Sequence, residues 1–140
     1  MNSIQAFLNP IPLEPIQAPV SQRYLDEAGN PILWEFRPIS HKENEAINRR
    51  CMRRDSKGEH FDLQGYKEGL VAASIVYPDL SDAALQEALG TQGDEVKTMK
   101  ALLPVMGEFA AAYQAACQVN GLLESPGDLL DEAKNASGRA

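Results

Sequence analysis

The sequence predicts a mainly α fold of the α+β class, in which an N-terminal arm and a β-hairpin pack on a compact bundle of five or six short helices. Helix-start and helix-stop signals alternate from Ser40 to Gly121, which is typical of short packed helices. Residues 21–39 instead show two apolar runs on either side of a turn, which is typical of a hairpin. Because 140 residues suffice for one hydrophobic core, we expect residues 21–123 to form a single domain.

Residues 1–20 are expected to form an extended arm. Prolines recur there, and each removes a backbone N–H donor and favours an extended conformation in the residue before it. The arm also carries Phe7 and Leu8 among several apolar residues, which is more apolar content than a solvated linker needs. It is therefore either a disordered tail or an arm that lies across a partner or a neighbouring subunit.

Residues 21–39 predict the hairpin. The first strand passes through Tyr24 and Leu25, a turn follows at residues 27–30, and the second strand alternates apolar and polar side chains around Trp34 and Phe36. A two-stranded hairpin alone is marginally stable in water. We therefore expect Trp34 and Phe36 to pack on the helices of residues 40–123.

Local capping signals predict each helix. Ser40 and Glu43 form a capping box that opens a helix running through Cys51 to about Arg54. Asp62 caps a second helix, which ends before Pro78. The later signals, in chain order, are a short third helix from Ser81 to Gly90, a fourth from Gly93 or Asp94 through Leu102, a fifth from Pro104 to Asn120-Gly121, and a short sixth at Ser125-Pro126 in the acidic tail, residues 124–140.

The segment LLPVMGEFAAAYQAACQVNG, residues 102–121, is apolar around most of its helical circumference. Only a narrow polar strip, containing Glu108, Gln114 and Gln118, interrupts the apolar surface. A helix of this kind is either the centre of a core or a partner-binding surface. We expect it to serve as both.

Four residues of this helix are the expected contacts for a partner. Phe109 and Tyr113 supply large apolar area, and Ala111 and Ala115, at the edge of the polar strip, leave room for another helix to approach closely. A second candidate contact is a basic cluster in the first helix, for which a solvated helix end, an acidic protein partner and nucleic acid are the alternatives. Its members are Arg49, Arg50, Arg53 and Arg54, with Glu45 placed to pair with Arg49.

Composition and motifs narrow the classes of function. A formal net charge of −7 disfavours binding to nucleic acid, and no apolar run is long enough to span a membrane. Cys51 and Cys117 lie far apart without the spacing of a metal site. No nucleophile elbow, glycine-rich phosphate loop or paired-carboxylate motif is present. We therefore expect a cytoplasmic protein that is not an enzyme and uses no metal or cofactor.

Four stretches together resemble the small tail assembly chaperones of tailed phages and prophages of Gram-positive hosts. The resemblance covers about residues 21–121 and consists of order and spacing. The stretches are NPILWEFRPIS, NRRCMRR, FDLQGYKEGLVAASIVYPDLSDAALQEALG and LLPVMGEFAAAYQAACQVNG.

The resemblance implies a chaperone that binds the phage tape measure protein, keeps it soluble and helps recruit tail tube subunits. The tape measure protein is a long, apolar-rich helical rod, and the chaperone is not kept in the mature virion. Members of the family are often made in two forms, the longer by translational frameshifting. Self-association, a structural tail-completion or connector protein, and a small regulatory adaptor remain open as alternatives.

Overall fold

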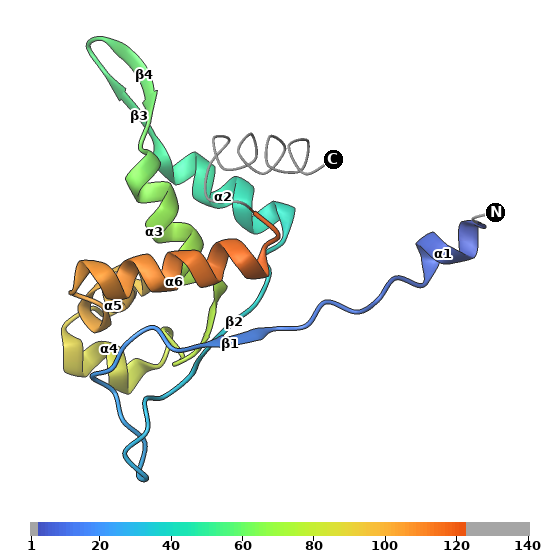
Figure 1. The fold of residues 1–140 in the computed structure, drawn as a ribbon. Helices are drawn as coiled ribbons and strands as arrows, with labels where there is room; N and C mark the ends of the chain where they lie inside the picture. The colour runs from blue at the N-terminus through green and yellow to red at the C-terminus, as the bar shows by residue number, and fades with distance from the viewer. Residues whose placement is uncertain (1–2, 123–140) are drawn as a thin grey trace, which may run out of the picture.

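The computed structural model of the protein describes residues 3–122. Within that range, the N-terminal segment and the hairpin β3–β4 project from a helical body (Figure 1). In chain order, the elements are α1 (Ile4–Leu8), β1 (Ile16–Ala18), β2 (Trp34–Phe36), α2 (His41–Cys51), β3 (Met52–Asp55), β4 (Gly58–Phe61), α3 (Leu63–Ser74), β5 (Ile75–Tyr77), α4 (Ala83–Leu89), α5 (Glu95–Leu102) and α6 (Met106–Val119). The mainly α, α+β fold class is confirmed. The helix expected at Ser125-Pro126 lies outside the described residues.

A three-stranded antiparallel sheet, in the order β1-β2-β5, closes one side of the helical body. The turn expected after Tyr24 is present, but the segments before and after it do not form a two-stranded ladder. They are joined only by an isolated bridge between Leu25 and Pro31 and by a few backbone hydrogen bonds. Instead, β2 is the central strand of the sheet; it pairs on one side with Ile16–Ala18, inside the segment expected to be an arm, and on the other with β5. Alternation along Trp34–Phe36 predicted a strand facing the core, but it carries no information about which segment pairs with it.

The first helix ends earlier than the sequence predicted. Its capping box is confirmed, because the Ser40 hydroxyl accepts the Glu43 N–H at 3.1 Å and the Glu43 carboxylate accepts the Ser40 N–H at 3.0 Å. However, α2 stops at Cys51 rather than near Arg54, and the following residues form the hairpin β3–β4. Asp55 accepts the Lys57 N–H at 2.8 Å, and Gly58 adopts a φ of +113°. This turn chemistry overrides the helical tendency of the residues before it.

Two other helix starts differ from the prediction. Asp82, not Ser81, caps α4 by accepting the Leu85 N–H at 2.8 Å, while Ser81 donates its hydroxyl to Asp79. The long helix α6 begins at Met106 rather than Pro104, because residues 103–105 turn the corner after α5. The expected stops are confirmed: Gly90 and Gly121 adopt the left-handed conformation, with φ of +69° and +70°.

The core lies where α3 meets α2, α5, α6 and the sheet. As expected, β2 contributes Trp34 and Phe36, which are 2% and 0% exposed. Small residues on α6, Ala112 and Ala116, are fully buried and allow that helix to pack closely on α3. The other large, fully buried side chains are Ile47, Leu70, Val71 and Met99.

Glu108 joins the segment between β1 and β2 to the corner between α5 and α6. Its carboxylate is buried and accepts two hydrogen bonds from the Arg23 guanidinium, both at 2.9 Å, and one from the Ser21 hydroxyl. Arg23 also donates to the Leu102 carbonyl at 3.3 Å, as does the Tyr24 hydroxyl at 2.5 Å. These hydrogen bonds favour the ionised carboxylate, and they lower the pKa of Glu108 from 4.5 to about 2, with Arg23 the main cause. The prediction that Glu108 belongs to a solvated strip is wrong.

Replacing Glu108 with glutamine is expected to lower the free energy of unfolding at pH 7 by about 2 kcal/mol, because charged hydrogen bonds are lost from a buried site. Since the pKa of Glu108 is lower in the folded than in the unfolded protein, its contribution is complete above pH 4.5 and disappears as the pH falls toward 2. Urea unfolding of the two proteins at several pH values measures this difference, which should shrink steadily below pH 4.5.

Glu59→Gln is the matched control. Glu59 pairs with Arg54 at 2.6 Å, but both side chains are mostly exposed. Such a pair contributes less than about 1 kcal/mol, so this variant should unfold almost like the wild type. Equal losses for the two variants would contradict the role given to Glu108.

Candidate partner-binding surface

An apolar stripe runs along the solvent side of α6. Met106, Phe109, Ala110 and Tyr113 follow the spacing i, i+3, i+4, i+7, which places them on one face of the helix; we call them the α6 stripe. Met106 is 74% exposed, Ala110 is also exposed, and the two aromatic residues are half-buried. The rings of Phe109 and Tyr113 stack with centroids 6.4 Å apart. The two aromatic residues therefore anchor the stripe to the core, while Met106 and Ala110 are accessible to solvent.

A charged side chain of α3 lies beside the α6 stripe. The ammonium group of Lys67 lies 5.2 Å from the centroid of the Tyr113 ring, within the range of a cation–π interaction. Apolar side chains with a charged neighbour at their edge are common in protein-binding surfaces.

The structure places two of the four expected α6 contacts on this stripe and two elsewhere. Phe109 and Tyr113 belong to the stripe, but Ala115 is only 4% exposed and faces the core, and Ala111 is half-buried. The exposed positions of the helix are Met106, Gly107, Ala110, Gln114 and Gln118. The expected polar strip is therefore exposed at Gln114 and Gln118, but Glu108 turns inward to Arg23. Helical periodicity alone could not reveal that pairing.

Val105 and Met106 are exposed apolar residues at the start of α6. Val105 is 51% exposed. Both follow Pro104, which is also exposed and lies in the corner after α5. The sequence predicted a helix boundary at this point, between Leu102 and Pro104, but it placed Val105 inside the following helix rather than in the corner.

The arm exposes a second group of apolar side chains. Phe7 and Leu8 lie on α1, a short helix with no buried residue, and they are 77% and 62% exposed. The arm is otherwise extended as far as β1, and Figure 1 shows α1 well away from the helical body. Three further residues, Ile4, Ile11 and Leu13, are also exposed. The fold of a single chain thus leaves these side chains uncovered.

The four arginines do not form one continuous site. Arg49 and Arg50 lie in the last turn of α2, whereas Arg53 and Arg54 lie on β3, and all four are exposed. Arg53 pairs with Asp62 at 3.5 Å and Arg54 with Glu59 at 2.6 Å. The ion pair expected between Glu45 and Arg49 does not form among the described residues. Half of the cluster is therefore neutralised by nearby carboxylates.

Residues 3–122 contain no group of three histidine, cysteine, aspartate or glutamate side chains arranged to hold a metal ion. Cys51 and Cys117 are both buried thiols. None of the helices in this range combines the length and the apolar character that crossing a membrane requires.

Comparison with known proteins shows similarity along nearly the whole chain. The model of the family described as phage XkdN-like tail assembly chaperone protein matches residues 4–134. The phage-like element PBSX protein XkdN of Bacillus subtilis (strain 168) is 32% identical over 130 residues, which cover 89% of this chain and 87% of XkdN. The uncharacterised protein YqbN of the same organism is 28% identical, with the same coverage.

A solved structure shows the same fold. The crystal structure of the protein YqbN superposes with a TM-score of 0.73 and 24% sequence identity, covering 88% of this chain and 99% of that chain. Both the family match and this superposition extend beyond residues 21–121, the range of the resemblance seen in the sequence.

Ala110→Glu and Ala115→Glu are expected to differ in their effect on folding. Ala110 faces solvent, so its glutamate stays hydrated and the melting temperature should remain near that of the wild type. Ala115 is buried, so a glutamate there loses its hydration without a partner and should destabilise the protein strongly. Thermal melting followed by circular dichroism makes the comparison. Similar melting temperatures for the two variants would contradict the orientation of α6.

Proposed function

We propose that this chain, which belongs to the family of phage XkdN-like tail assembly chaperones, binds a tape measure protein and keeps it soluble. It further helps to recruit tail tube subunits, acts in the host cytoplasm and leaves before the virion is complete. The observation that supports this most directly is the α6 stripe, an apolar surface exposed on an acidic domain. The role requires binding and release only, in keeping with a chaperone-type family.

The shape of the α6 stripe suits an apolar helix. Ala110 lies between Met106 and Tyr113, so its small side chain leaves a depression that a helix ridge can enter. Met106 is unbranched and adapts to different apolar side chains, which suits a partner whose sequence varies along its length. The stacked rings of Phe109 and Tyr113 provide a fixed apolar base.

The alternatives make different demands on the chain. A tail-completion or connector protein would remain in purified phage particles, whereas a chaperone would be missing from them. A regulatory adaptor that binds acidic partners would use the arginine cluster, but Arg53 and Arg54 already pair with carboxylates of the same chain. The geometry therefore favours the α6 stripe over the arginines as the main contact.

Ala110→Glu tests the contact. In the free protein the new carboxylate is hydrated, but a bound apolar helix would remove that hydration at a cost of several kcal/mol. Co-expression with the cognate tape measure protein measures the result as the soluble yield of that protein. We expect the soluble yield to fall about tenfold, which corresponds to a loss of about 1.4 kcal/mol in binding.

Ala88→Glu is the matched control, because Ala88 is an exposed alanine on a different helix, α4. It should melt like the wild type and keep the tape measure protein soluble. If Ala110→Glu is folded and still keeps the partner soluble at the wild-type level, the binding surface lies elsewhere and the α6 stripe is only a surface of the core.

We also propose that the arm makes a second contact, with a neighbouring copy of the chain. Phe7→Ser and Leu8→Ser together remove two of the three large exposed apolar side chains of α1 without touching the core. The double variant should melt like the wild type but sediment closer to the monomer at high concentration, because an apolar contact between copies is lost. An identical sedimentation profile over a wide concentration range would contradict this role of the arm.

A further inference from the structure

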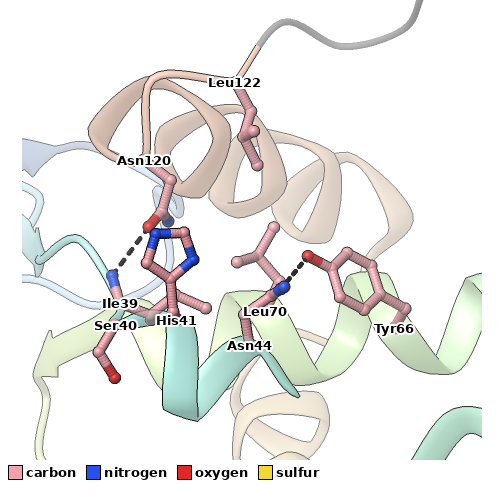
Figure 2. A pocket seen from close by; sticks show the side chains of 8 residues that line it. All are labelled: Ile39, Ser40, His41, Asn44, Tyr66, Leu70, Asn120 and Leu122. Atoms are coloured by element: carbon pink, nitrogen blue, oxygen red, sulfur yellow. Dashed lines mark hydrogen bonds between the residues drawn. The ribbon is translucent and has the colours of Figure 1, made fainter. Parts of the chain in front are cut away.

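A groove lies between the start of α2, the middle of α3 and the end of α6 (Figure 2). This open groove has a volume of about 480 Å³, and we call it the α2–α3–α6 groove. Ile39, Leu70 and Leu122 give it an apolar surface, and the Tyr66 ring continues that surface along α3. The groove is separate from the α6 stripe, since no residue of the stripe lines it.

The polar residues of the groove differ in their hydrogen bonds. Asn120 is fully engaged: its oxygen accepts the Ile39 N–H at 2.8 Å, and its nitrogen donates to Ser74 and to the Ala116 carbonyl. The Asn44 oxygen accepts the Tyr66 hydroxyl at 2.5 Å. Within residues 3–122, however, no group accepts a hydrogen bond from the Asn44 amide nitrogen or from His41. The α2 side of the groove therefore offers donors to an incoming segment.

We propose that the C-terminal segment of the same chain, residues 123–140, docks in the α2–α3–α6 groove, with Leu129 and Leu130 on its apolar surface. The place where the described chain ends supports this choice of occupant. Leu122, the last described residue, is itself part of the groove wall, so residues 123–140 start beside it. This inference is independent of the proposed function.

The length and the sequence of the segment fit a return to the groove. Leu129 lies seven positions after Leu122, and seven extended residues span about 23 Å, which leaves enough chain for a turn between the two leucines. Pro126 and Gly127 stand between them, and both residue types favour a reversal of chain direction. The adjacent leucines then reach the groove without strain on α6.

Charge favours the same placement. The acidic residues of the segment, Glu124, Asp128, Asp131 and Glu132, outnumber its basic ones, Lys134 and Arg139. The groove begins at the start of α2, where the helix dipole is positive and where His41 and Lys42 are exposed. Glu43, the nearest carboxylate of α2, is already paired with Arg37 at 2.5 Å. Carboxylates of the segment therefore meet donors and positive charge at this end of the groove.

A spin label on the full-length chain tests the proposal. In the variant Ala133→Cys, the new thiol is labelled while the native thiols, both buried, are protected. If the segment docks, amide signals of His41, Asn44 and Leu70 in nuclear magnetic resonance spectra should be lost selectively, while those of α4 keep their intensity. Unchanged groove signals, or a uniform loss over the whole surface, would overturn the proposal.

Two further samples complete the test. Adding Leu129→Asp and Leu130→Asp to the labelled chain should restore the groove signals, whereas Ala136→Asp, a matched charge change outside the leucine pair, should not. A mixed sample detects contact between copies. In it, one set of chains carries the isotope but no spin label, and the other set carries the spin label but no isotope. Loss of groove signals in that mixture would mean that the segment of a second copy fills the groove, which would overturn docking within one chain.

Discussion

The ion pair between Arg23 and Glu108 is the interaction on which the arrangement of the other elements depends. It joins residues that are 85 positions apart and places the segment between β1 and β2 against the corner between α5 and α6. That placement directs β1 along β2, and so holds Trp34 and Phe36 over the core. The Tyr24 hydroxyl, bonded to the Leu102 carbonyl, reinforces the same junction. A buried carboxylate with four donors around it is satisfied only in this one arrangement.

The same ion pair decides which face of α6 is exposed. With Glu108 turned inward, Ala112 and Ala116 pack on α3, and Met106 and Ala110 face solvent. The helix that supplies part of the core therefore also carries the surface proposed to bind a partner. Phe109 and Tyr113 contribute to both, since each is half-buried against the core and forms part of the α6 stripe.

Local features were predictable from the sequence, and long-range ones were not. The caps at Ser40 and Asp62 and the stop at Gly90 depend on residues at most a few positions away, and each was predicted correctly; Asp94, the cap of α5, was one of the two starts predicted for that helix. The partner of β2 and the inward turn of Glu108 depend on segments far away in sequence, which periodicity does not encode. The hairpin β3–β4 was missed for another reason: its arginines suit a helix end as well as a strand, and the signal lay in the turn at Asp55-Ser56-Lys57-Gly58.

Under the proposed function, exposed apolar surface carries a cost before a partner binds, because copies of the chain can associate through the same side chains. The net charge of −7 opposes this, since every encounter between copies brings like charges together. An apolar partner without excess negative charge would meet no such repulsion. The acidity of the chain, which disfavours nucleic acid, would therefore also favour binding to such a partner over association between copies. The contact between copies proposed for the arm then needs a high concentration of the chain, which binding to a shared partner also provides locally.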